Sequence, residues 1–307
     1  MTYLSIVIPV LNETTLINEL FKRVKIAAEQ ITNDFEIILV DDGSTDDTWN
    51  QILKNTNIEN RFKAIRFTRN FGHHYAITAG LQTASGEWVV VMDGDLQDRP
   101  EVIPELYKKT TEGYDVVFVS RKNRTEKIYY RLGQKIFYFT LNLLSGVNFD
   151  SSQANFSIIN RKVVEAFKAF PENSRFYGST INWLGFKRGK ILADQGKRFS
   201  GKPSYTIRKR FKLALDIIFS FSDRPLKWAI GLGSFLSLVA SILGIYIVFR
   251  ALTSGFSVMG WPSLIAAIFF NTGVILIVLG ILGVYIGRIY TEAKGRPLFA
   301  ISEQINV

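Results

Sequence analysis

The chain has 307 residues, 47% of them hydrophobic, with no cysteine and a formal net charge of +10. That length suggests one or two domains with ample core, and the lack of cysteine excludes disulfides and thiol chemistry. The positive charge suits nucleic acid, an anionic substrate or a membrane surface, and its position along the chain distinguishes these partners. A strand is predicted almost from the first residue, so no signal peptide is expected.

The first part of the chain alternates short apolar runs with amphipathic segments. Strands are predicted at 4–9, 35–40, 62–67, 88–92 and 114–119. Helices are predicted at 15–31, from about 46 with Thr45 as the cap, at 72–83 and at 100–112. This order of elements predicts an α/β fold, in which helices cover both faces of a mainly parallel sheet.

Beyond residue 121 the pattern is less regular. Residues 126–144 and 206–221 are each predicted to form an amphipathic helix, the first rich in aromatic residues and the second basic at its start. Helices of this kind can lie in a membrane interface, which is the interpretation favoured here. The alternative is an ordinary surface helix packed on the core.

Two long stretches near the end of the sequence carry no charge, one between Lys227 and Arg250 and the other between Arg250 and Arg288. Each can supply the roughly 20 apolar residues of a membrane-spanning helix, so spans are predicted at about 228–249 and 262–287. Two buried core helices are the alternative. Basic residues precede the first span and follow the second, whereas the connecting loop is uncharged. This pattern predicts a multi-pass protein of the cytoplasmic membrane with both termini in the cytoplasm.

The placement of the charge also bears on partners. Because the basic residues concentrate beside the spans, a lipid bilayer is a predicted partner and nucleic acid is not. Small residues on the spans would allow a homo-oligomer to form.

Carboxylates recur where the predicted strands end. Asp93 and Asp95 follow the strand at 88–92, Glu13 follows the first strand, and Asp41 and Asp42 follow the second. Since the carboxyl ends of parallel strands share one edge, these acids are expected to converge there, where a divalent cation would compensate their charge. Mg²⁺ or Mn²⁺ bound to a diphosphate is the predicted ligand, and simple turn or cap residues are the alternative for each acid.

Other common sites are not indicated. The first strand lacks a following Gly-x-Gly-x-x-Gly, and no Gly-Lys-Ser/Thr phosphate loop is present. His73 and His74 are adjacent, so they would face different ways on a helix, and a structural or capping role is predicted for them rather than a two-histidine metal site.

Five motifs occur in order along the chain, at 8–13, 40–46, 69–72, 93–98 and 198–201. Together they resemble glycosyltransferase family 2, and more closely its polyprenyl-phosphate glycosyltransferases, which include dolichyl-phosphate mannosyltransferase and the GtrB-type glucosyltransferases. The apolar pair of helices extends the resemblance and favours the GtrB type. The resemblance implies a GT-A (Rossmann-like) catalytic domain at 1–205, a juxtamembrane amphipathic helix at 206–226, and a transmembrane hairpin with a short cytoplasmic tail at 227–307.

The resemblance also implies roles for individual residues. Asp93 and Asp95 match the metal-binding acids, and Asp150 matches a family acid that could act as a base or shape the sugar pocket. The residues that match nucleotide-sugar contacts are Pro9, Leu11, Glu13, Val40, Asp42, Gly94, Gln97, Arg121 and Arg198. The candidates for binding the lipid phosphate are Arg124, Lys127, Arg131, Lys202, Arg208 and Arg210. Ser204 stands where the family often has lysine.

The expected activity is therefore inverting, metal-dependent transfer of a hexose from a nucleotide sugar, UDP-glucose in the GtrB type, to polyprenyl (undecaprenyl) phosphate. GDP-mannose or another nucleotide sugar is an open alternative as donor. A catalytically inactive membrane scaffold with the same fold is a second alternative, supported by Ser204. A processive polysaccharide synthase is disfavoured, because the sequence has too few spans and lacks Gln-x-x-Arg-Trp.

Overall fold

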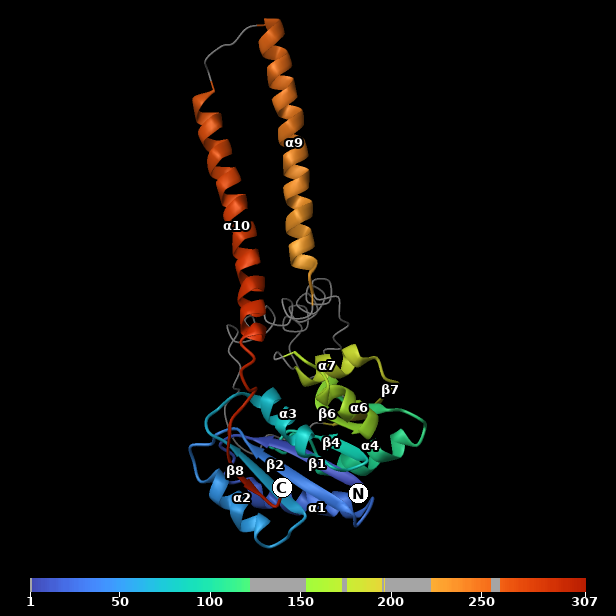
Figure 1. Ribbon diagram of the computed structural model, residues 1–307. Helices are drawn as coiled ribbons and strands as arrows, with labels where there is room; N and C mark the ends of the chain where they lie inside the picture. The colour runs from blue at the N-terminus through green and yellow to red at the C-terminus, as the bar shows by residue number, and fades with distance from the viewer. Residues whose placement is uncertain (1, 122–152, 173–175, 195, 197–221, 255–259) are drawn as a thin grey trace. The chain divides into compact units, whose positions relative to one another are not determined.

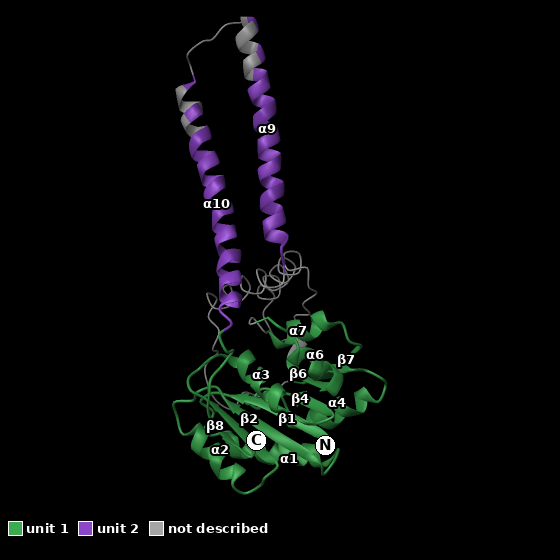
Figure 2. Ribbon diagram, in the orientation of Figure 1, with its two compact units in different colours: residues 1–138, 147–204, 296–307 green, residues 139–146, 205–295 purple. Residues whose placement is uncertain are grey.

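The computed structural model describes residues 2–121, 153–172, 176–194, 196, 222–254 and 260–307. The chain forms two compact units (Figure 2). The first consists of residues 1–138, 147–204 and 296–307, and the second of residues 139–146 and 205–295. The helices predicted at 126–144 and 206–221 lie outside the described residues.

The first unit is built on an eight-stranded sheet with the order β7-β5-β6-β4-β1-β2-β3-β8 (Figure 1). The strands are β1 (Leu4–Val10), β2 (Phe35–Asp41), β3 (Phe62–Phe67), β4 (Trp88–Val91), β5 (Val116–Arg121), β6 (Gln153–Asn160), β7 (Arg188–Ala193) and β8 (Ile301–Ile305). The central strands β4, β1, β2 and β3 are parallel, whereas β6 pairs antiparallel with β4 and β5, and β8 pairs antiparallel with β3. The sheet is therefore mixed.

Helices cover both faces of this sheet, as the sequence predicts. They are α1 (Ile17–Glu29), α2 (Thr48–Thr56), α3 (His73–Thr83), α4 (Ile103–Thr110) after the short 3₁₀ helix η1 (Pro100–Val102), α6 (Arg161–Lys168) and α7 (Tyr177–Leu184). Ile6 and Ile8 of β1 pack with α1, α2 and α4, whereas Val7 between them packs with α3, α6 and α7. This alternation of neighbouring residues follows from the two-residue period of a strand.

The sequence predicts β1 to β5 and their helices but misses β6, α6, α7, β7 and β8. The predicted cap at Thr45 is wrong, because α2 begins later and its N-cap is Asp47. Thr45 donates its backbone N–H to Oδ1 of Asn12 instead, 2.9 Å away, and the carboxylate of Asp46 accepts from the N–H of Thr48. The residues before α2 thus bind the loop after β1.

The second unit contains two long apolar helices, α9 (Arg224–Ser254) and α10 (Trp261–Ala293). Both are long and apolar enough to cross a membrane by length and composition, over Arg224–Tyr246 and Ala267–Ala293. Within the described residues, 6% of the first window and none of the second is buried. Exposed Leu, Ile and Phe side chains of this kind suit a lipid environment better than the alternative of two buried core helices.

Candidate active site

The predicted acids lie at one edge of the sheet because the strands before them are neighbours. In register, Pro9 of β1 lies beside Val40 of β2, and Val7 lies beside Val91 of β4. The three strands are parallel, so the segments that follow them meet at the carboxyl edge. The sequence predicts this arrangement.

The loop after β4 is held in a tight conformation. The N–H of Asp93 donates to the carboxylate of Asp98, and the N–H of Gln97 donates to Oδ1 of Asp95 at 3.0 Å. Leu96 has a φ of 57°, which is uncommon for a residue with a side chain and is frequent at functional sites. A Cβ at Gly94 would lie 2.6 Å from Cγ1 of Val10, so glycine allows the loop to approach β1.

His73 lies beside Asp93, a placement the sequence does not predict. Its Nε2 lies 3.2 Å from Oδ1 of Asp93 and 3.3 Å from the amide nitrogen of Asn155 in β6. Burial lowers the pKa of His73, but the Asp93 carboxylate, with Asp42 and Asp95, outweighs this effect and raises it above the usual value. The only sequence signal was that His73 directly follows the motif at 69–72.

The neighbouring His74 has the structural role predicted for it. It is half-buried, its Nδ1 accepts from the N–H of Tyr177 at the start of α7 (3.4 Å), and its ring packs edge-on against Phe176. Burial, with the adjacent His73, lowers its pKa to about 3. His74 is therefore neutral at ordinary pH.

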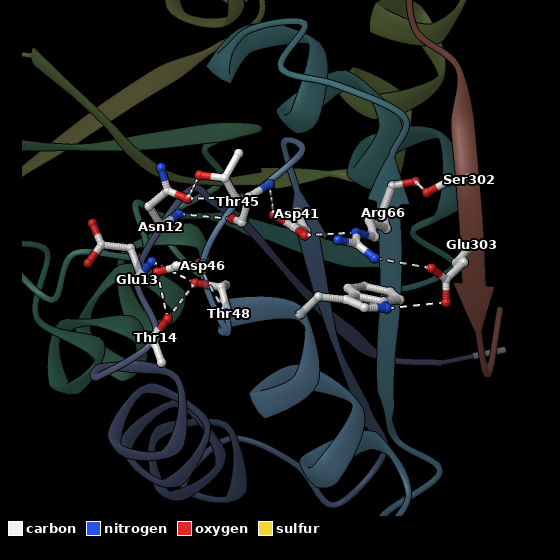
Figure 3. Close-up of polar contacts among 12 residues, drawn as sticks. Asn12, Glu13, Thr14, Asp41, Thr45, Asp46, Thr48, Arg66, Ser302 and Glu303 are labelled. Atoms are coloured by element: carbon white, nitrogen blue, oxygen red, sulfur yellow. Dashed lines mark hydrogen bonds and ion pairs between the residues drawn. The ribbon is translucent and has the colours of Figure 1, made fainter.

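The loops after β1 and β2 are bound to each other (Figure 3). The N–H of Asn12 donates to Oγ of Ser44 at 2.9 Å, and the N–H of Glu13 donates to Oγ1 of Thr48 at 2.8 Å. Asn12 has a φ of 56°, so this loop, like the one containing Leu96, includes a left-handed residue. These contacts fix the backbone that carries Leu11 and Glu13.

Asp42 is buried and holds a backbone loop. Its carboxylate accepts hydrogen bonds from the N–H groups of Phe71 and Gly72, at 2.8 and 3.0 Å. Burial raises the pKa of Asp42, although these hydrogen bonds and His73 oppose the shift. Asp42 thus connects the end of β2 to the start of α3.

Known proteins have sequences similar to this chain over most or all of its length. Residues 5–167 match the profile described as glycosyl transferase family 2. An uncharacterized glycosyltransferase of Synechocystis sp. is 38% identical over 301 residues, covering 98% of this chain and 95% of that protein. The bactoprenol glucosyl transferase of Shigella phage SfV is 35% identical over 302 residues, covering 98% of each chain. This chain belongs to glycosyltransferase family 2.

Solved structures confirm the fold expected of this glycosyltransferase. A crystal structure of glucosyl-3-phosphoglycerate synthase from Mycobacterium tuberculosis, in complex with Mn²⁺, uridine diphosphate and glucosyl-3-phosphoglycerate, has a TM-score of 0.53. The two proteins are 18% identical, and the match covers 73% of this chain and 80% of that one. The first unit therefore has the GT-A fold.

The predicted nucleotide-sugar residues of the glycosyltransferase differ in exposure. Leu11 is 38% exposed and Glu13 is half-buried, whereas the side chains of Pro9 and Val40 are buried. Arg121 ends β5, beside Ala193 of β7. Predicted residues that lie outside the described part of the chain are Asp150, Arg198, Arg124, Lys127, Arg131, Lys202, Arg208 and Arg210.

The donor atoms at this edge suit a cation that is shared with a substrate. Asp93 and Asp95 are both half-buried and lie on one loop. Among the described residues, no group of three or more His, Cys, Asp or Glu side chains is placed to hold a metal by itself. Mg²⁺ and similar ions commonly take one or two carboxylates and complete their shell with water and substrate phosphates, so two aspartates fit that mode of binding.

Proposed function

We propose that this glycosyltransferase transfers glucose from UDP-glucose to a polyprenyl phosphate at a membrane surface. The observation that carries the proposal is the full-length similarity to proteins named bactoprenol glucosyl transferase, with 34–36% identity. The two apolar helices support it, because a long polyprenyl chain stays in the bilayer and only its phosphate reaches water. Ser204, where the family often has lysine, lies outside the described residues.

The donor is proposed to bind at the carboxyl edge of β4, β1 and β2. Asp93 and Asp95 would hold Mg²⁺ or Mn²⁺, which when bound stabilises negative charge on the leaving diphosphate. Gly94 lets the loop that carries both carboxylates approach β1 closely. Arg121 and Arg198 are proposed to bind the phosphates, since guanidinium groups match their geometry.

The acceptor needs little activation. A phosphate monoester has a second pKa of about 6, so it is largely dianionic at neutral pH. The protein must mainly hold this phosphate against the anomeric carbon and exclude water. Asp150 is proposed to shape that pocket or accept a proton, and Arg124, Lys127, Arg131, Lys202, Arg208 and Arg210 are proposed to bind the lipid phosphate.

The membrane topology is proposed from the chain path. β3 and β8 belong to one sheet, yet both apolar helices lie between them in sequence. Strands that pair must be on the same side of a bilayer, which requires an even number of spans between them. A two-span hairpin satisfies this requirement, and the flanking basic residues favour the cytoplasm for both ends.

Transfer assays test the proposal. Radiolabelled nucleotide sugars, including UDP-glucose and GDP-mannose, are incubated with undecaprenyl phosphate and the full chain in vesicles, with Mg²⁺, Mn²⁺ or a chelator. We expect label in lipid from UDP-glucose only when metal is present, and a loss of about 100-fold or more in Asp95→Asn.

The matched control for that variant is Asp34→Asn, which removes the same charge from an exposed residue before β2, at the opposite edge of the sheet. It should transfer at the wild-type rate. Undiminished transfer by Asp95→Asn would overturn the metal role, and a preference for another sugar would reassign the donor. No transfer from any sugar would favour the inactive scaffold.

A further inference from the structure

Strand β8 completes the edge of the catalytic sheet beyond β3. Glu303 lies opposite Arg66 in the pairing, and the hydroxyl of Ser302 donates to the carbonyl oxygen of Arg66 at 3.1 Å. Next to the strand, the amide of Asn306 donates to the carbonyl oxygen of Phe62 at 2.9 Å. Both ends of β8 are therefore attached to the domain.

Glu303 contacts two side chains of the domain (Figure 3). Its Oε1 lies 3.2 Å from a terminal nitrogen of Arg66, and its Oε2 accepts from Nε1 of Trp49 at 3.2 Å. Trp49 is 3% exposed, and the guanidinium of Arg66 lies 5.5 Å from the centre of its ring. An isolated surface ion pair contributes little, but here a buried indole fixes the position of the carboxylate.

Arg66 carries the connection to a buried acid. Its Nε lies 3.6 Å from Oδ2 of Asp41, a fully buried carboxylate at the end of β2. The other oxygen of Asp41 accepts from the N–H of Ser44 at 2.9 Å, and Oγ of Ser44 accepts from the N–H of Asn12. The polar contacts thus continue from β8 to the loop after β1.

The position of Arg66 matters because a buried carboxylate is costly without a compensating charge. Arg66 is partly exposed, so its long side chain could also extend into solvent. Glu303 and Trp49 hold it over β3 and beside Asp41. If Arg66 moved away, the turn that Asp41 organises at Ser44 would lose support at the edge proposed to bind the nucleotide.

We infer that Glu303 is a positioning residue for nucleotide binding, acting through Arg66 and Asp41 on the loops after β2 and β1. The inference rests on the proposed function, which places the nucleoside diphosphate at these loops. Strand β8, which follows both apolar helices in the sequence, would then contribute to the affinity of the site for the nucleotide. Glu303 itself is not expected to contact the substrate.

The test uses the full chain in detergent and compares Glu303→Ala with Ser302→Ala. The control removes a different β8 contact, the hydrogen bond from Ser302 to the backbone of Arg66. UDP affinity is measured by calorimetry with Mn²⁺, kcat and KM for UDP-glucose by transfer, and stability by thermal unfolding without nucleotide. We expect Glu303→Ala to raise Kd for UDP and KM by about 5-fold, with kcat nearly unchanged.

Two further variants test whether Glu303 acts through its contacts with Arg66 and Trp49. Glu303→Gln, which keeps one carbonyl oxygen to accept from Arg66 or Trp49 but replaces the other oxygen with an NH2 donor, should restore part of the affinity. Arg66→Met combined with Glu303→Ala should bind UDP no more weakly than Arg66→Met alone, since both act through one connection. An unchanged Kd in Glu303→Ala, or an equal rise in Ser302→Ala, would overturn the inference.

Failure of the proposed function gives a different result. If the wild type binds UDP but transfers no sugar to polyprenyl phosphate, the proposed acceptor is wrong and the Kd comparison still decides the role of Glu303. If the wild type binds no UDP, the proposed donor is wrong, and the inference that rests on it fails with it.

Discussion

Gly72 donates its backbone N–H to both carboxylate oxygens of Asp42, at 3.1 and 3.0 Å. Gly72 has a φ of 120°, a backbone conformation that residues with a side chain rarely adopt, and it immediately precedes α3. The acid of the second strand therefore fixes the residue before the helix that carries His73. The contact joins two sequence motifs, at 40–46 and 69–72, that are separate in the chain.

Replacing Asp42 by Ala should destabilise the domain by about 2–3 kcal/mol, because the N–H groups of Phe71 and Gly72 would lose their acceptor. Asp42→Asn keeps one acceptor oxygen and should cost less. Chemical unfolding of the full chain, followed by tryptophan fluorescence, measures both. Equal stability of Asp42→Ala and the wild type would show that the loop does not depend on this carboxylate.

A pH effect is expected from Glu36, which is buried in β2. Burial raises its pKa, but hydrogen bonds from Lys63, Ser5 and Ser85 outweigh that effect and hold the pKa below the usual value. The unfolded chain therefore binds the proton more readily, so this stabilisation is present above the ordinary pKa of Glu and is lost as the pH falls through the lowered value. Stability should decline in that acidic range.

Glu36→Gln should reduce this acid dependence and cost about 3 kcal/mol at neutral pH, since it leaves the 2.7 Å contact with Lys63 without a charge partner. Unfolding free energies measured between neutral and acidic pH provide the test. Glu29→Gln is the control, because its contacts with Lys25 and Arg61 are long and half-exposed. The prediction fails if both variants keep the wild-type pH dependence.

Gly94→Ala should impair catalysis more than stability. The new Cβ would lie 2.6 Å from Cγ1 of Val10 and 3.1 Å from the carbonyl oxygen of Pro9, so the loop must shift and displace Asp93 and Asp95. A displacement of about 1 Å at reacting groups can cost about 100-fold in rate. Transfer assays measure the loss, and Gly178→Ala, whose Cβ has 3.9 Å of space, should remain active.

The topology can be tested because the chain contains no cysteine. Single substitutions Asp34→Cys, Ser257→Cys and Val307→Cys are labelled in sealed inverted vesicles with a membrane-impermeant maleimide. We expect Asp34→Cys and Val307→Cys to react from the cytoplasmic side, and Ser257→Cys to react only after the membrane is opened. Labelling of Asp34→Cys and Val307→Cys from opposite sides would contradict the hairpin.

Hydrophobic periodicity predicts β1 to β5 because these strands are short apolar runs followed by polar turns. It misses β8, whose residues are mostly exposed and polar between Ile301 and Ile305, because an edge strand needs little apolar surface. It also misses β6, in which Asn155 and Ser157 interrupt the apolar run. Both strands pair with strands that are distant in sequence, β8 with β3 and β6 with β4, and such pairing produces no local pattern of hydrophobic residues.

The sequence likewise predicts some residues of the candidate site and misses others. Asp93 and Asp95 could be predicted because an apolar strand ends immediately before them and because the motif at 93–98 matches the family. The contact between His73 and Asp93 depends on how α3 lies over the sheet, so no spacing in the sequence reveals it. The carboxylate of Asp42 is likewise bound to Phe71 and Gly72, a contact visible only after folding.

The late position of β8 in the chain has a consequence for synthesis. A ribosome makes β1 to β7 first, then both apolar helices, and only afterwards the residues of Ile301–Ile305. Until then β3 has an unpaired edge, which is a template for unwanted strand pairing. The nascent domain therefore reaches its finished sheet only after both apolar helices have left the ribosome.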